Sequence, residues 1–154
     1  MSSALSYFVE WEDRYSVGVP AIDRQHRVLV SMIRQLQEAM ASGSTRELLV
    51  PLAHKLTTYT VYHFQWEEQF YQREGFSQIE AHRVLHRHMA DQVSRMAQAS
   101  HEGRLKAGTP ILIFLQHWLI DHILGEDKGA FAECAEKRME RESEPSRAMD
   151  SGAT

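Results

Sequence analysis

The sequence predicts an all-α protein: an up-down-up-down antiparallel four-helix bundle with a short C-terminal helix and a disordered tail. Apolar residues recur through most of the chain at about 3.6 residues per turn, the period of an amphipathic helix. No stretch alternates in the manner of a strand, and short polar loops separate four long periodic segments. A length of 154 residues suits one domain, which we place at residues 1–139, followed by the tail at 140–154.

The first two helices are each followed by a glycine, which is a helix stop signal. The first is expected over residues 23–40, where apolar side chains recur at helical spacing before Gly43. The second is expected over residues 46–73, before Gly75.

The third helix is expected over residues 77–102. Thr109 followed by Pro110 is typical of an N-cap with proline in the first helical position, and predicts a fourth helix that reaches about Leu124. A short fifth helix is expected over residues 128–138. The stretch after it is charged and rich in small residues, which predicts disorder.

The composition argues against several classes of function. The chain has 17 Lys and Arg against 21 Asp and Glu, so it lacks the basic field that binds nucleic acids. Its single cysteine allows neither an internal disulfide nor a thiolate-rich metal site, which favours a cytoplasmic location. The first residues do not resemble a signal peptide, and the most apolar stretch, 111–124, is too short to cross a bilayer. We therefore expect no nucleic-acid partner and no membrane insertion.

Nine histidines in so short a chain need an explanation, because neutral imidazole is the commonest metal ligand in proteins. His63 and Glu67 are four residues apart, as are His82 and His86, so each pair shares one helix face. A single pair of this kind is more often an ordinary helix surface. In the predicted bundle, however, both pairs lie at the same end as two further histidines, which predicts a metal site. The converging residues are His26, His63, Glu67, His82, His86 and His122.

The fourth helix offers two candidate carboxylates. Glu126 lies four residues after His122 and stacks on it, whereas Asp127 lies five residues after it and points elsewhere on an ideal helix. Spacing therefore favours Glu126 narrowly, although a distortion at Gly125 would swing Asp127 inward. The other four histidines are expected to lie away from this site: His54, His88, His101 and His117.

The donor set favours two metal ions. Five imidazoles and two carboxylates are too many for one tetrahedral zinc. Nitrogen and oxygen donors without thiolate point to iron, with manganese, zinc and copper as alternatives. The chain contains no Glu-x-x-His motif, which disfavours a ferritin-like di-iron site. A surplus of imidazole over carboxylate suits the holding of oxygen better than the oxidation of a substrate.

The motifs that carry these residues resemble those of the hemerythrins, most closely the single-domain bacterial members. The resemblance extends over about residues 11–131. The matching segments are Ile22-Asp23-x-Gln25-His26, His63-Phe64-x-x-Glu67-Glu68, His82-x-x-x-His86 and Trp118-Leu119-x-x-His122-Ile123-x-x-x-Asp127.

The resemblance implies reversible dioxygen binding, for storage, delivery or buffering, at two iron ions joined by an oxo or hydroxo bridge. It assigns His82, His86 and His122 to one iron and His26 and His63 to the other, with Glu67 and Asp127 as bridges in preference to Glu126. It also implies an apolar oxygen pocket with four walls, which equally fit an ordinary core: Phe64, Trp118, Leu119 and Ile123.

Two alternatives stay open for the same centre. One is an oxygen or redox sensor that is read by a separate protein partner, and the other is the scavenging of peroxide or nitric oxide. The apolar pocket and the lack of an additional acid or base favour a protein that is not an enzyme. Trp66 is expected to pack between helices, and Cys134 to be an idle thiol.

Overall fold

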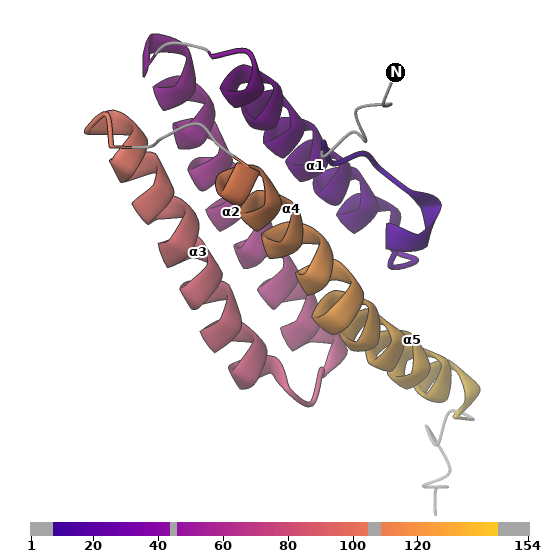
Figure 1. Ribbon diagram of the computed structural model, residues 1–154. Coiled ribbons are helices and arrows are strands. Elements are labelled where there is room, and N and C mark those ends of the chain that lie inside the picture. Colours follow the sequence, from indigo (N-terminus) through magenta and orange to yellow (C-terminus); the bar gives the residue numbers. More distant parts are fainter. Residues whose placement is uncertain (1–7, 44–45, 105–108, 145–154) are drawn as a thin grey trace, which may run out of the picture.

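The computed structural model describes residues 8–43, 46–104 and 109–144, except for the side chains of 109–112. Within these ranges every regular element is a helix, which confirms the all-α prediction. Figure 1 shows the four long helices side by side in an antiparallel bundle, with α5 extending beyond it. The elements are η1 (Asp13–Tyr15), α1 (Pro20–Ala41), α2 (Arg46–Glu74), α3 (Ile79–His101), α4 (Thr109–His122), η2 (Ile123–Asp127) and α5 (Lys128–Ser143).

The helices pack through apolar stripes at the expected spacing. Leu29, Ile33 and Leu36 of α1 are completely buried and belong to the same core cluster as Leu56 of α2. Helix α2 contacts α1, α3 and α5, and α1 also contacts α4. This arrangement brings the start of α1, the end of α2, the start of α3 and the end of α4 to one end of the bundle.

The helix boundaries follow the local sequence signals closely. Helix α1 begins at Pro20, three residues before the expected start, because proline is well suited to the first helical position. Gly43 and Gly75 follow α1 and α2 with φ angles of 71° and 77°, the left-handed conformation that glycine adopts without strain. The glycine stop signals therefore place the ends of both helices correctly.

The fourth and fifth helices are not separate, contrary to the expectation. The π-helical segment η2 joins α4 directly to α5, so that one helical rod continues to Ser143. The assignment of residues 140–143 to a disordered tail was therefore wrong. Ion pairs support these turns, because Arg138 contacts Glu142 at 3.4 Å and Arg141 reaches Glu74 of α2 at 2.5 Å. Glu144 follows as the C-cap of the helix, and residues 145–154 of the predicted tail lie outside the described residues.

The first turns of α5 cover the end of the bundle. Ala130, Phe131 and Cys134 form a second buried cluster with Ile22 of α1 and Tyr71 of α2. Among the described residues, no helix combines the length and the apolar character that a membrane span requires.

Candidate metal centre

The seven predicted ligands gather at the end of the bundle that α5 covers. Each of them is at most 5% exposed. They form two groups in which one ligand atom from each residue lies within 4.8 Å of the others. The first group is His82, His86, His122 and Asp127, and the second is His26, His63 and Glu67.

The π-helical segment η2 determines which carboxylate of the fourth helix faces the site. In a π-helix the hydrogen bonds run between residues five apart, as the backbone bond from the N–H of Lys128 to the carbonyl of Ile123 shows. Residues five apart then share a helix face, so Asp127 lies on the same face as His122, which points into the site, and is completely buried. Glu126 turns outward, with its side chain 46% exposed. The narrow preference of spacing for Glu126 was therefore wrong, because spacing assumes an unbroken α-helix.

Asp127 contacts both groups of ligands. Its Oδ1 lies 3.1 Å from Nε2 of His82 and 3.1 Å from Nε2 of His122. Its Oδ2 lies 3.3 Å from Nε2 of His26, in the other group. The two oxygens of this carboxylate therefore face different sets of imidazoles, as a bridging ligand requires.

Glu67 faces the second group with one oxygen. Its Oε1 contacts Nε2 of His63, one turn earlier on α2, and lies 3.8 Å from Nε2 of His26. Its Oε2 accepts a hydrogen bond of 2.9 Å from the hydroxyl of Tyr71. The same hydroxyl lies 3.1 Å from Oδ1 of Asp127, so Tyr71 links the two carboxylates.

Two further side chains orient ligand imidazoles from outside the site. Nδ1 of His63 lies 2.7 Å from Oε1 of Gln25, and Nδ1 of His86 lies 2.9 Å from Oε1 of Glu68. With a proton on Nδ1, each ring would donate to its oxygen and leave the Nε2 lone pair free for a metal ion.

Sequence reasoning assigned no role to Gln25, Glu68 or Tyr71. The spacing of Tyr71, four residues after Glu67 on the same face of α2, was a usable signal. The contacts of Gln25 and Glu68 depend on how neighbouring helices pack, so spacing along one helix does not reveal them.

The electrostatics of the centre favour ionised carboxylates. Burial and the charge of Asp127 raise the pKa of Glu67, but the contacts with His63 and His26 outweigh them and lower the value to about 2. Burial lowers the pKa of His26, but Asp127 and Glu67 outweigh it and raise the value to about 9. In the metal-free protein, a charged His26 therefore partly balances two buried negative charges. Burial lowers the pKa of His86, which keeps this imidazole neutral.

Many buried polar atoms of the site have no hydrogen-bond partner in the described structure. Native proteins leave few such atoms unpaired, so a concentration of them in one place indicates a ligand. Nitrogen and oxygen donors without sulfur suit iron, and their division into two groups suits two ions. The residues therefore fit a di-metal centre. The unpaired atoms include Nε2 of His26, His63, His86 and His122, Oε1 of Glu67 and Oδ2 of Asp127.

The four predicted pocket walls lie beside the ligands in the main core. The ring of Phe64 stacks on His86, with 3.9 Å between centroids and 6° between planes. Trp118 is 6.4 Å from Phe64 and donates its indole N–H to the carbonyl of Met89 at 3.1 Å. Leu119 and Ile123 are at most 2% exposed. The four side chains therefore belong to the hydrophobic core and also form apolar surroundings for the candidate metal centre.

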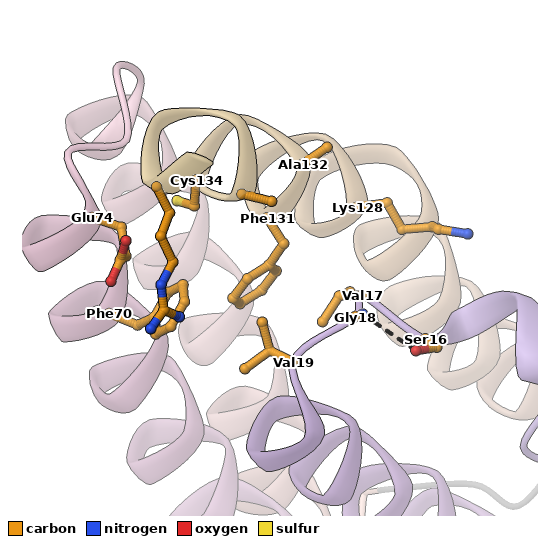
Figure 2. A pocket seen from close by; sticks show the side chains of 12 residues that line it. Ser16, Val17, Gly18, Val19, Phe70, Glu74, Lys128, Phe131, Ala132 and Cys134 are labelled. Carbon is orange, nitrogen blue, oxygen red and sulfur yellow. Dashed lines mark hydrogen bonds between the residues drawn. The ribbon is translucent and has the colours of Figure 1, made fainter. Parts of the chain in front are cut away.

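The four histidines that were expected to lie elsewhere are all exposed: His54, His88, His101 and His117. Trp66 stacks against Phe70 at 6.0 Å, in agreement with a packing role. Cys134 is buried and unpaired, and burial raises its pKa to about 11. Figure 2 shows its sulfur in the wall of a cavity of about 340 Å³, next to Phe131. None of the seven ligands lines that cavity.

The geometry agrees with comparisons to known proteins. The family model for the hemerythrin HHE cation binding domain matches residues 17–134. A bacteriohemerythrin from Pseudomonas aeruginosa is 29% identical over 119 residues, which cover 77% of this chain and 76% of that protein. A bacteriohemerythrin from Stenotrophomonas maltophilia is 30% identical over 122 residues, with the same coverage of 77% and 76%. A solved structure of wild-type hemerythrin has a TM-score of 0.74 at 24% identity, over 82% of this chain and 97% of that one, and so shares the fold. The chain therefore belongs to the hemerythrin family.

Proposed function

We propose that this chain binds dioxygen reversibly at two iron ions, and that it is an oxygen-binding protein rather than an enzyme. The observation that carries the proposal is the position of Asp127. Its two oxygens lie 3.1 Å from His82 and His122 and 3.3 Å from His26, so one buried carboxylate contacts both histidine groups. Two ferrous ions held there would supply the electrons and the coordination position that dioxygen binding needs.

The ligands are divided unequally between the two groups. His82, His86 and His122 would hold one ion together with Asp127, whereas His26 and His63 would hold the other together with Glu67. Asp127 also lies 3.3 Å from His26 of the second group. Because His26 and His63 would supply only two imidazoles, the ion that they hold would keep a coordination position at which dioxygen could bind. This division, together with the family, supports oxygen binding over a purely structural metal site.

The surroundings of the centre support binding without further chemistry. Phe64, Leu119 and Ile123 are at most 5% exposed and exclude water from this end of the core. The hydroxyl of Tyr71 is held by Glu67 and Asp127, and burial followed by these two charges raises its pKa well above the usual value. Its proton is therefore poorly available for acid catalysis.

The role that we propose is the storage, delivery or buffering of oxygen in the cytoplasm. The unpaired Cys134 supports a reducing compartment. The competing roles are sensing through a separate partner and the scavenging of peroxide or nitric oxide. In these roles we expect the centre to become oxidised, whereas an oxygen-storage protein would release dioxygen unchanged.

The test is a cycle of oxygenation followed by optical spectroscopy. The protein is loaded with ferrous iron without air, exposed to air, and then evacuated. A charge-transfer band that appears in air and disappears under vacuum over repeated cycles supports reversible binding. Conversion to an oxidised form that evacuation does not reverse would refute it and favour sensing or scavenging.

A further inference from the structure

The ligands of the proposed metal centre are closed off from solvent. All seven are at most 5% exposed, so an ion that reaches them must pass through a defined opening in the protein. Such an opening must connect the protein surface with at least one of the seven ligands.

A cavity of about 370 Å³ lies between the start of α3 and the joined η2 and α5 segments. His82, one of the seven ligands, forms part of its wall. Behind His82, Oδ1 of Asp127 lies 3.1 Å from the Nε2 atom of the ring. The side chain of His82 therefore connects the cavity with the first group of ligands, which also contains His86, His122 and Asp127.

Glu126 gives this cavity a negative charge. The other lining residues besides His82 are uncharged and mostly apolar, among them Phe76, Ala81 and Leu85. The Glu126 side chain is 46% exposed, and its Oε2 lies 3.6 Å from Nδ1 of His122. A carboxylate that is open to solvent on one side and next to a ligand on the other is placed to attract a divalent cation.

Four other cavities in the described part of the chain do not offer such a route. None of the seven ligands lines any of them. The cavity in Figure 2 is lined by Phe131 of α5. The ring of Phe131 packs at 4.9 Å against Tyr71, which in turn contacts the bridging carboxylates.

We propose that the cavity between α3 and α5 is the route by which divalent metal ions enter the centre, with Glu126 as the residue that captures the ion at its mouth. From Glu126 the ion passes His82 and reaches Asp127. This inference rests on the proposed metal centre, and it gives a function to the carboxylate that the π-helical segment turns away from the ligands.

The first test measures the rate of cobalt(II) uptake by the metal-free protein, followed by its visible absorption after rapid mixing. Glu126→Gln removes the charge and keeps the shape, so we expect uptake about tenfold slower at low ionic strength, with the difference shrinking in high salt. Chelator-driven release slows by the same factor, and the final stoichiometry stays at two ions per chain. Glu136→Gln is the matched control, since it removes an exposed charge on α5 outside the cavity.

The second test narrows the cavity without touching a charge. Gly129 lines the cavity, and a Cβ at this position would meet nothing within 4 Å. We therefore expect a larger side chain at this position to extend into the cavity. We expect Gly129→Leu to slow both uptake and release at least tenfold. Gly129→Ala, which improves the helix but leaves most of the space open, should stay close to the wild type.

The outcomes separate this inference from the proposed centre. Wild-type rates in both Glu126→Gln and Gly129→Leu, with two ions bound, would overturn the route and leave the centre intact. Reduced stoichiometry or faster release in Glu126→Gln at an unchanged uptake rate would also overturn it, because Glu126 would then act through His122 alone. A wild-type chain that binds no cobalt would overturn both.

Discussion

The hydroxyl of Tyr71 provides a sensitive test of how the centre is held together without metal. Tyr71 is completely buried, and its hydroxyl lies 2.9 Å from Oε2 of Glu67 and 3.1 Å from Oδ1 of Asp127. The substitution Tyr71→Phe removes this hydroxyl alone. The ring keeps its contacts with Phe131 at 4.9 Å and with Phe76 at 5.1 Å.

The size of the effect follows from the charge of the acceptors. A phenol has one hydrogen to donate, so it forms one full hydrogen bond with a carboxylate at a time. Hydrogen bonds to charged groups contribute about 1.5–3 kcal/mol. We therefore expect Tyr71→Phe to lower the free energy of unfolding of the metal-free protein by about 2 kcal/mol, which corresponds to about 4–8 °C in Tm.

The assay is urea denaturation of the metal-free protein followed by circular dichroism, supported by thermal melting. Tyr15→Phe is the matched control, because Tyr15 is also buried but its hydroxyl donates to the exposed Glu12. We expect a clearly smaller loss in the control. Equal losses in the two variants, or no loss in Tyr71→Phe, would refute the role of Tyr71 as a link between the carboxylates.

Three further predictions concern the ligands, the pH and the thiol. Asp127→Asn should bind fewer than two ions per chain by metal analysis, whereas Glu126→Gln should still bind two at equilibrium, because only Asp127 faces both histidine groups. The charged His26, whose pKa is raised from 6.5 to about 9, stabilises the metal-free fold fully below pH 6.5, and this contribution is lost as the pH rises through about 9. Ionised Glu67, whose pKa is lowered from 4.5 to about 2, stabilises it above pH 4.5, and this contribution is lost as the pH falls towards 2. Urea midpoints should therefore be highest at about pH 5–6. Cys134, 2% exposed with a pKa of about 11, should react with a thiol reagent at pH 8 much more slowly in the native protein than in urea.

Each of these predictions has a result that would count against it. Two ions in Asp127→Asn would remove this residue from the ligand set. A urea midpoint that rises from pH 6 to pH 10 would show that the charge on His26 does not stabilise the fold. Equally fast modification of the native and unfolded protein would place Cys134 at the surface.

Much of the centre could be predicted because its ligands obey the regular geometry of single helices. His63 and Glu67 on α2, and His82 and His86 on α3, lie one turn apart, and the topology of an antiparallel bundle brings the pairs together. Glycine and proline signals placed most helix ends within three residues. These features are local, so they are visible in the sequence.

The position of Asp127 depends on the π-helical segment, which a regular period cannot reveal. Hydrogen bonding between residues five apart exchanges the faces of Glu126 and Asp127, and only the resemblance to a known family selected the carboxylate that faces the histidines. The contacts of Gln25 with His63 and of Tyr71 with Asp127 arise between helices, and so they depend on packing rather than on spacing. The extension of α5 to Ser143 depends in part on the contact of Arg141 with α2, a partner distant in sequence.

The most direct test of the central claim is anomalous X-ray diffraction at the iron edge from crystals of the iron-loaded protein. We expect two iron peaks in the core, one among His82, His86 and His122 and the other next to His26 and His63. Density for the Asp127 carboxylate should lie between the two peaks. A single peak, or iron bound only at surface histidines such as His117, would contradict it.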